Sequence, residues 1–298
     1  MTGIPFVREI DCRYGEAVDV SQRIRRLIAP NPGPFTYTGT GVYIVGRGRV
    51  AVIDPGPEVP EHFEALKRTL EGEEVACVLV SHSHMDHSPL AHPLAQWAGC
   101  KVYAGGPVIP TASEVRLEAG DDLAFKPDET LKDGDLFEGP DWTIEAVASP
   151  GHTSNHFCFA LRQENALFSG DHVMGWSTTV ISPPDGNMGD YYASLEKVRA
   201  RGYQTIWPTH GPPVRDVPPF LDAYIAHRMA REAAIVERLK AGDTRIPQMV
   251  KTIYKDVDAK LHPAACHSVL AHMIHLVETG VAAADAPFDL ATDYQPAG

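Results

Sequence analysis

The sequence has no apolar run of the roughly 18 residues that a helix needs to span a bilayer. Its first residues also lack the basic head and apolar stretch that mark a secretory signal. We therefore expect a soluble, cytoplasmic protein with no membrane partner.

Basic residues are scarce, with 26 Lys and Arg against 39 Asp and Glu and a formal net charge of −13. This balance repels polyanions and argues against non-specific nucleic-acid binding over the whole surface, although a local patch could still bind one. There are only five cysteines in 298 residues, and none forms a C-x-x-C pair. This spacing indicates neither a disulfide framework nor a thiolate metal site.

Short apolar runs alternate with helical patterns over the first two thirds of the chain. Val42–Val45 and Val50–Ile53 flank a Gly/Arg turn and predict a β-hairpin. Pro60–Leu70 has helical spacing, Val75–Val80 is short enough for a buried strand, and Asp190 is expected to cap a later helix. Mixed strands with interspersed helices predict an α/β domain of stacked layers.

A change in composition at Gly211–Pro219, with four prolines in nine residues, predicts a domain boundary. We divide the chain into a catalytic domain (1–210), a Pro-rich linker (211–219), a helical domain (220–280) and a loosely ordered tail (281–298). The helical domain is expected to contain the helices Phe220–Lys240, Ile246–Tyr254 and Ala259–Glu278. Three such helices suit a small winged-helix-like domain, and a plain helical appendage would have much the same pattern.

The clearest chemical signal is a cluster of His82, His84, Asp86 and His87 directly after the apolar strand Val75–Val80. A strand end followed by a tight loop holds such side chains rigidly. Together with ligands from elsewhere, the four offer more nitrogen and oxygen atoms than one four-coordinate metal can take. The spacing therefore points to two metals.

Three further candidates, His152, Asp171 and His210, each lie in a short loop next to a predicted strand. Glycines and prolines around them let the backbone turn, so that one side chain can project from the sheet edge. Each would be a weak signal alone.

Together these seven positions follow the order H-x-H-x-D-H, later His, Asp, last His, and the chain resembles the metallo-β-lactamase superfamily from about Val42 to Gly211. The resemblance implies a four-layer αββα sandwich with two divalent metal ions, zinc in the first place, with iron and manganese as alternatives. It assigns His82, His84 and His152 to one metal, Asp86, His87 and His210 to the second, and Asp171 to a bridge between them.

The resemblance also implies a hydroxide between the metals as the nucleophile, with Asp86 as the catalytic residue that orients it. Among the remaining histidines, only His172, next to Asp171, is expected to support the ligands. A non-catalytic, metal-stabilised binding protein is disfavoured, because this His/Asp set leaves room for water whereas structural sites are closed.

Several members of the superfamily remain open as function. Its true β-lactamases usually have Cys or Ser at the position of Asp171, which makes β-lactam hydrolysis a less favoured activity. Residues 31–40 and 227–280 resemble the lactamase-like branch with a C-terminal winged-helix-type domain, which includes an endoribonuclease and many hydrolases.

Residues 221–280 hold eight Lys and Arg against seven Asp and Glu, and Lys260 is the only Lys or Arg in the last predicted helix. A nucleic-acid reader needs a basic stripe. We therefore predict a hydrolase of a small ester, thioester or lactone, with metal-dependent cleavage of single-stranded RNA as the alternative and a homodimer left open. Candidate substrate walls are Phe35, Tyr37, Met174, Trp176, Tyr191 and Tyr192.

Overall fold

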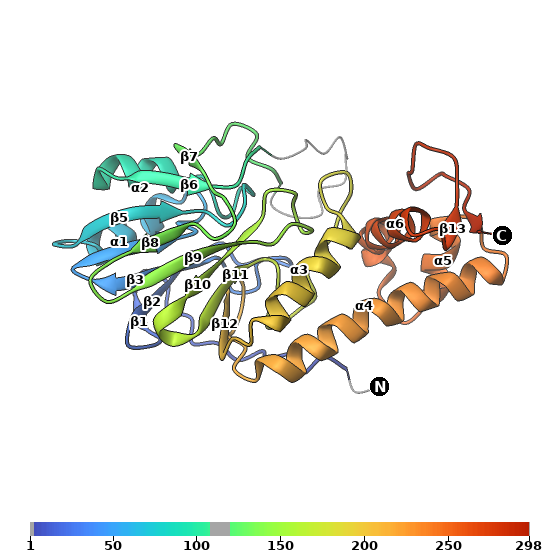
Figure 1. Cartoon of the computed structure of the whole chain (residues 1–298), viewed down its shortest axis with the longest axis horizontal. Helices are drawn as coiled ribbons and strands as arrows, with labels where there is room; N and C mark the ends of the chain where they lie inside the picture. Colours follow the sequence, from blue (N-terminus) through green and yellow to red (C-terminus); the bar gives the residue numbers. More distant parts are fainter. Residues whose placement is uncertain (1–2, 108–119, 298) are drawn as a thin grey trace.

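The computed structural model describes residues 3–107 and 120–297, and its first two thirds form two β-sheets that lie face to face (Figure 1). Seven strands form the first sheet in the order of the sequence. They are β1 (Val18–Asp19), β2 (Ile24–Ile28), β3 (Gly41–Arg47), β4 (Arg49–Ile53), β5 (Glu74–Leu79), β6 (Lys101–Ala104) and β7 (Glu129–Thr130). The hairpin of β3 and β4 confirms the predicted one, and β4 and β5 run parallel.

The second sheet has five strands in the order β12-β11-β10-β9-β8. Its strands are β8 (Leu136–Glu138), β9 (Thr143–Ala148), β10 (Phe157–Leu161), β11 (Ala166–Gly170) and β12 (Thr205–Pro208). β11 and β12 run parallel, so their carboxyl ends meet at one edge of the sheet. A single-turn helix, η1 (Arg162–Glu164), joins β10 to β11.

The hydrophobic core between the sheets is built from alternate residues of facing strands. Tyr43, Ile53 and Leu79 of the first sheet pack with Phe159 and Phe168 of the second. Side chains alternate between the two faces of a strand, so the intervening residues face outwards. Both faces of each sheet therefore need cover.

Helices provide that cover. The outer face of the first sheet packs against α1 (Pro60–Thr69) and α2 (Ala91–Ala98), and that of the second against α3 (Met188–Ala200) and the start of α4 (Val217–Lys240). The result is the expected αββα sandwich of four layers.

Two helix starts differ from the prediction. Asn187, rather than Asp190, caps α3, and its side chain accepts a hydrogen bond from the Asp190 backbone N–H. Helix α4 begins at Val217, inside the segment predicted to be a linker. Pro218 and Pro219 fit there because the N–H groups of a first helical turn have no partner within the helix.

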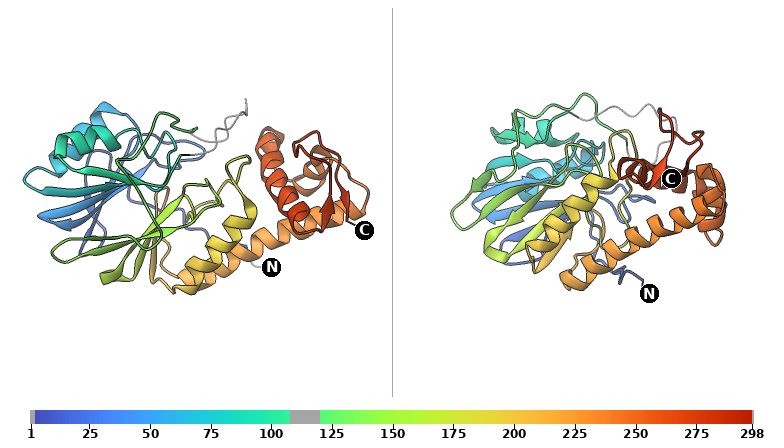
Figure 2. Two further views of the ribbon diagram at one scale, coloured as in Figure 1. Left: turned by 45° about the horizontal axis from the view of Figure 1, so that its top comes forward. Right: turned by 45° about the vertical axis from the view of Figure 1, so that its right-hand side comes forward.

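Helix α4 joins the sandwich to the C-terminal helices, as both views of Figure 2 show. Its first half packs in the outer core of the second sheet through Phe220 and Tyr224, and its second half packs in the C-terminal core through Ile235 and Leu239. At 1.5 Å per residue its 24 residues span about 36 Å. One continuous helix therefore belongs to both cores.

The C-terminal core is completed by α5 (Ile246–Ile253), the short η2 (Ala259–Leu261) and α6 (His262–Glu278). The prediction of a loosely ordered tail is wrong. Strands β13 (Ala282–Ala283) and β14 (Gln295–Pro296) pair, and Tyr294 is buried in this core. The alanine and proline content of the tail gave no indication that Tyr294 is buried. None of the helices in the described part of the chain could span a bilayer as an apolar segment.

Candidate metal centre

All seven predicted ligands are buried and lie together at the carboxyl ends of strands from both sheets. His82, His84, Asp86 and His87 follow β5, and the other three follow strands of the second sheet: His152 comes after β9, Asp171 after β11 and His210 after β12. Because β4 with β5 and β11 with β12 are parallel pairs, their ends converge on one edge of the sandwich.

The first group consists of His82, His84 and His152, whose ligand atoms all lie within 4.8 Å of one another. The Nε2 atom of His82 is 2.9 Å from Nδ1 of His84. On the other side of the His84 ring, Nε2 lies 3.4 Å from Oδ1 of Asp121, which leaves Nδ1 to face the group. Three imidazole nitrogens thus surround one point.

The second group consists of Asp86, His87 and His210, again within 4.8 Å. The Nε2 atom of His210 is 3.1 Å from Oδ2 of Asp86, and Nε2 of His87 is 3.6 Å from Oδ1 of the same carboxylate. This set mixes nitrogen and oxygen ligands, as divalent first-row metals accept.

Asp171 lies between the two groups. Its Oδ1 is 3.6 Å from Nε2 of His87 and 3.4 Å from Nε2 of His210, whereas its Oδ2 is 3.9 Å from Nε2 of His152. One carboxylate oxygen therefore faces each group. This is the geometry that a bridging ligand needs, and the assignment of the individual ligands stays a prediction.

The buried carboxylates Asp86 and Asp171 stabilise positive charge on the side of the cluster that they face. Burial alone would raise the pKa of Asp86, but the facing rings of His87 and His210 outweigh burial and lower it to about 2. Burial alone would lower the pKa of His210, but Asp171 and Asp86 outweigh burial and raise it to about 10. In the first group, burial lowers the pKa of His82 well below its ordinary value, which keeps the imidazole in its neutral, metal-binding form.

In the second group and Asp171, three buried polar atoms lack a hydrogen bond of good geometry to any described residue: Nε2 of His87, Nε2 of His210 and Oδ1 of Asp171. Leaving such atoms unsatisfied is costly, and they point at one another. A divalent cation held by both nitrogens and the oxygen would satisfy all three at once. The residues present therefore fit a divalent metal at this point.

The backbone around His152 explains why glycine precedes it. Gly151 has φ of +136°, and a Cβ atom there would lie 2.4 Å from Cα of Tyr191. The Nδ1 atom of His152 lies 2.7 Å from the carbonyl oxygen of Val180, so a ring N–H donated there turns Nε2 towards Asp171.

Asp54, which follows β4 and is fully buried, was not among the predicted site residues. Its Oδ2 atom accepts hydrogen bonds from the hydroxyls of Ser81 (2.7 Å) and Thr209 (2.9 Å) and lies 3.1 Å from Nδ1 of His87. A carboxylate on Nδ1 fixes the ring so that Nε2 faces the metal side. Its position at the end of an apolar strand was the available signal.

We expect Asp54→Asn to weaken metal binding at the group of Asp86, His87 and His210 about 10- to 100-fold, because the amide cannot accept all three hydrogen bonds and leaves His87 free to turn. Metal titration of the stripped protein measures this, and excess metal should restore part of the activity. Asp19→Asn, an exposed residue that pairs with Arg47, is the matched control. An unchanged metal affinity in Asp54→Asn would contradict the role given to this carboxylate.

His172 does not support the ligands as predicted. Its ring is buried against that of Tyr191, with centroids 5.0 Å apart, and makes no hydrogen bond to a candidate ligand among the described residues. His156 takes this role instead: its Nε2 accepts from the Asp171 backbone N–H at 3.2 Å, and its Nδ1 contacts the Ser149 hydroxyl at 2.9 Å.

The six residues predicted to form substrate walls lie in different surroundings. Phe35, Met174 and Trp176 line a pocket whose described lining includes none of the seven candidate ligands. Tyr37 stacks on Trp176 with ring centroids 4.9 Å apart, and Tyr191 is buried. Tyr192 contacts the C-terminal helices through His275.

Known proteins match both parts of the chain. Residues 37–210 match the family model of the Metallo-beta-lactamase superfamily, and residues 246–287 match that of the Beta-lactamase associated winged helix domain. A beta-lactamase-like protein 2 homolog of Caenorhabditis elegans is 30% identical over 272 residues, which are 88% of this chain and 86% of that protein. An atrochrysone carboxyl ACP thioesterase of Aspergillus terreus is 30% identical over 230 residues, 76% of this chain and 66% of that protein.

Solved structures show the same fold over nearly the whole chain. A beta-lactamase domain protein from Burkholderia ambifaria has a TM-score of 0.82 at 21% identity and covers 97% of this chain and 96% of its own. A metallo-beta-lactamase family protein from Thermus thermophilus has a TM-score of 0.75 at 20% identity, with coverage of 93% and 99%.

Proposed function

The chain belongs to the metallo-β-lactamase superfamily and is a metal-dependent hydrolase, and from that premise we propose that it uses two divalent metal ions to hydrolyse a thioester or a related small ester or lactone. The observation that carries the dinuclear site is the position of Asp171, with one carboxylate oxygen facing each histidine group. Thioester is the first choice among substrates because two relatives are named atrochrysone carboxyl ACP thioesterases.

The residues have distinct tasks in this proposal. His82, His84 and His152 hold one metal, and Asp86, His87 and His210 hold the other, with Asp171 shared. The metals would acidify water and polarise the carbonyl oxygen of the substrate. Asp86 is the catalytic residue: its carboxylate, 7% exposed at the centre, accepts a hydrogen bond from the attacking water and orients it.

Zinc is the proposed metal, with iron and manganese as alternatives, since all three accept nitrogen and oxygen ligands. A cytoplasmic location and a homodimer also stay predictions. Cell fractionation and light scattering of the purified protein would test them.

Metal analysis followed by a substrate panel tests the function. We expect two metal equivalents per chain and turnover of acyl thioesters, with slower turnover of esters and lactones. His84→Ala should lower kcat/KM at least about a hundredfold, because the first metal loses one of three imidazoles. The endoribonuclease alternative would replace this proposal under two conditions. Protein carrying two metals would have to leave thioesters, esters and lactones intact, and it would have to cleave single-stranded RNA in a metal-dependent way.

A further inference from the structure

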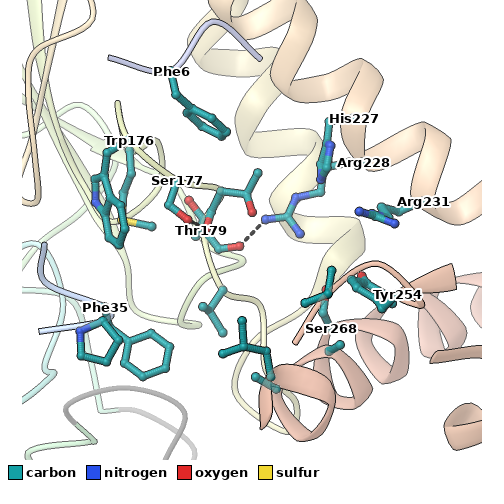
Figure 3. A pocket seen from close by; sticks show the side chains of 18 of the residues that line it. Phe6, Phe35, Trp176, Ser177, Thr179, His227, Arg228, Arg231, Tyr254 and Ser268 are labelled. Atoms are coloured by element: carbon teal, nitrogen blue, oxygen red, sulfur yellow. Dashed lines mark hydrogen bonds between the residues drawn. The ribbon is translucent and has the colours of Figure 1, made fainter. Parts of the chain in front are cut away.

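A pocket of about 450 Å³ lies between the sandwich and the C-terminal helices (Figure 3). Phe35 and Trp176 form one wall, Thr179 lies on the loop after Asp171, and Arg228, Arg231 and Tyr254 form the wall on the side of the C-terminal helices. Its volume is that of a pocket for a small organic molecule.

The charge of this pocket is opposite to that of the protein. Three arginines line it, Arg8, Arg228 and Arg231, and its described lining includes no Asp or Glu. None of the three forms an ion pair with a carboxylate of the described residues, although the chain has 39 Asp and Glu. Glu232, next to Arg231, contacts Tyr192 and His272 instead.

Arg228 is only 3% exposed, and its guanidinium is not fully satisfied. Its Nη2 donates to the carbonyl oxygen of Thr179, as drawn in Figure 3, while Nε has no hydrogen-bond partner among the described residues. Burial of a cation without a counter-charge is costly. Arg231 lies over the ring of Tyr254 at 4.5 Å, which holds the second guanidinium at the same wall.

The pocket and the metal centre share one stretch of backbone. Thr179 and Val180 line the pocket, and the Val180 carbonyl oxygen lies 2.7 Å from Nδ1 of His152. The Thr179 hydroxyl donates to the backbone oxygen of Asp171 at 2.8 Å. The loop after Asp171 therefore lines the pocket and also holds the His152 ring from the side opposite Asp171.

We propose that this pocket binds a negatively charged oxyacid group, a carboxylate or a phosphate, carried by the apolar body of the substrate. Guanidinium groups bind such oxygens through charge-assisted, bidentate hydrogen bonds, and the aromatic wall of Phe35 and Trp176 packs against the apolar part. The proposal rests on the proposed function and makes it more specific. The anion comes either from the far end of the acyl chain or from a phosphate on the thiol carrier.

Matched substrates separate the two sources. Glutaryl and valeryl thioesters of N-acetylcysteamine differ in a carboxylate at the acyl end, and valeryl thioesters of phosphopantetheine and pantetheine differ in a phosphate on the carrier. We expect one anionic member to have a KM at least about tenfold below that of its neutral partner, which is the size of one charge-assisted hydrogen bond. The pair that shows the difference identifies the source.

Arg231→Gln tests the pocket itself. Arg231 is half-buried and makes no hydrogen bond to the described residues, so its loss leaves the fold intact. We expect KM for the preferred anionic substrate to rise about tenfold, kcat to change little and the neutral substrate to be unaffected. Arg231→Lys should restore part of the affinity. Lys240→Gln removes a charge from the exposed end of the same helix and should behave as wild type.

Calorimetric titration with thioether analogues, which cannot be hydrolysed, separates this proposal from the proposed function. Tighter binding of the anionic analogue that Arg231→Gln abolishes supports the pocket even where no thioester is cleaved. Thioester turnover with equal KM for charged and neutral partners overturns the pocket and leaves the function standing. Tight, Arg231-dependent binding of single-stranded RNA at physiological salt, with no preference among thioesters, also overturns the assignment to a small anion.

Discussion

Replacing Asp171 by alanine is expected to lower kcat/KM for the best thioester at least about a hundredfold and to reduce bound metal from two equivalents towards one. The reason is that Oδ1 contacts the His87 and His210 side and Oδ2 the His152 side, so both sites lose a ligand at once. Metal analysis and steady-state kinetics on the same preparation measure both effects.

His275→Ala is the control for this variant. His275 lies on α6 against Tyr192, outside the cluster, and its loss should leave both the metal content and the activity unchanged. Circular dichroism of Asp171→Ala should match that of the wild type. Wild-type turnover by a folded Asp171→Ala protein would show that the bridging position is wrongly assigned.

Most of the candidate site could be predicted because its signals are local in the sequence. Four ligands lie within six residues after one apolar strand, His82 to His87. The other three lie in short loops with glycine or proline beside them, which is the pattern of a side chain projecting from a sheet edge. Parallel strands then bring these ends together.

The supporting groups could not be predicted because they depend on contacts between distant segments. Asp54 meets Thr209 across 155 positions of the sequence, and only the closure of the two sheets brings them together. His172 was predicted in place of His156 because it is next to Asp171 in the sequence. That adjacency does not determine which imidazole ring contacts the Asp171 backbone. Side chains on neighbouring strands can be closer than sequence neighbours that point to opposite faces.

The fold, like the site, could be predicted where its signals are local in the sequence and not where it depends on contacts between distant segments. Strand and helix positions followed from hydrophobic periodicity, whereas the course of α4 through two cores did not. Tyr224 on this helix accepts a hydrogen bond from the Thr179 backbone N–H (2.8 Å) and donates to the Ser177 carbonyl (2.9 Å). Helix α4 therefore fixes the loop that carries the wall of the pocket, and no local pattern in residues 174–180 indicates this.

Removing the metals with a chelator is expected to abolish hydrolysis and to lower the melting temperature by roughly 10 °C. A ligand at about a thousand times its Kd stabilises the folded state by about 4 kcal/mol. Each kcal/mol shifts the melting temperature of a chain of this size by about 2–3 °C. Differential scanning calorimetry and activity assays before and after chelation measure the two losses.

The physical reason lies in the convergence of buried charges. Asp86 and Asp171 are both less than a tenth exposed, and their oxygens lie within 4 Å of the buried rings of His87, His152 or His210. Nε2 of His87, Nε2 of His210 and Oδ1 of Asp171 have no well-formed hydrogen bond to the described residues. Without cations these groups bear their desolvation cost with incomplete compensation. Adding back zinc should restore both properties together, and the Asp171→Ala protein should show a smaller shift because it holds less metal. A chelated protein that keeps full turnover would show that the seven residues serve the fold and that hydrolysis does not depend on metal.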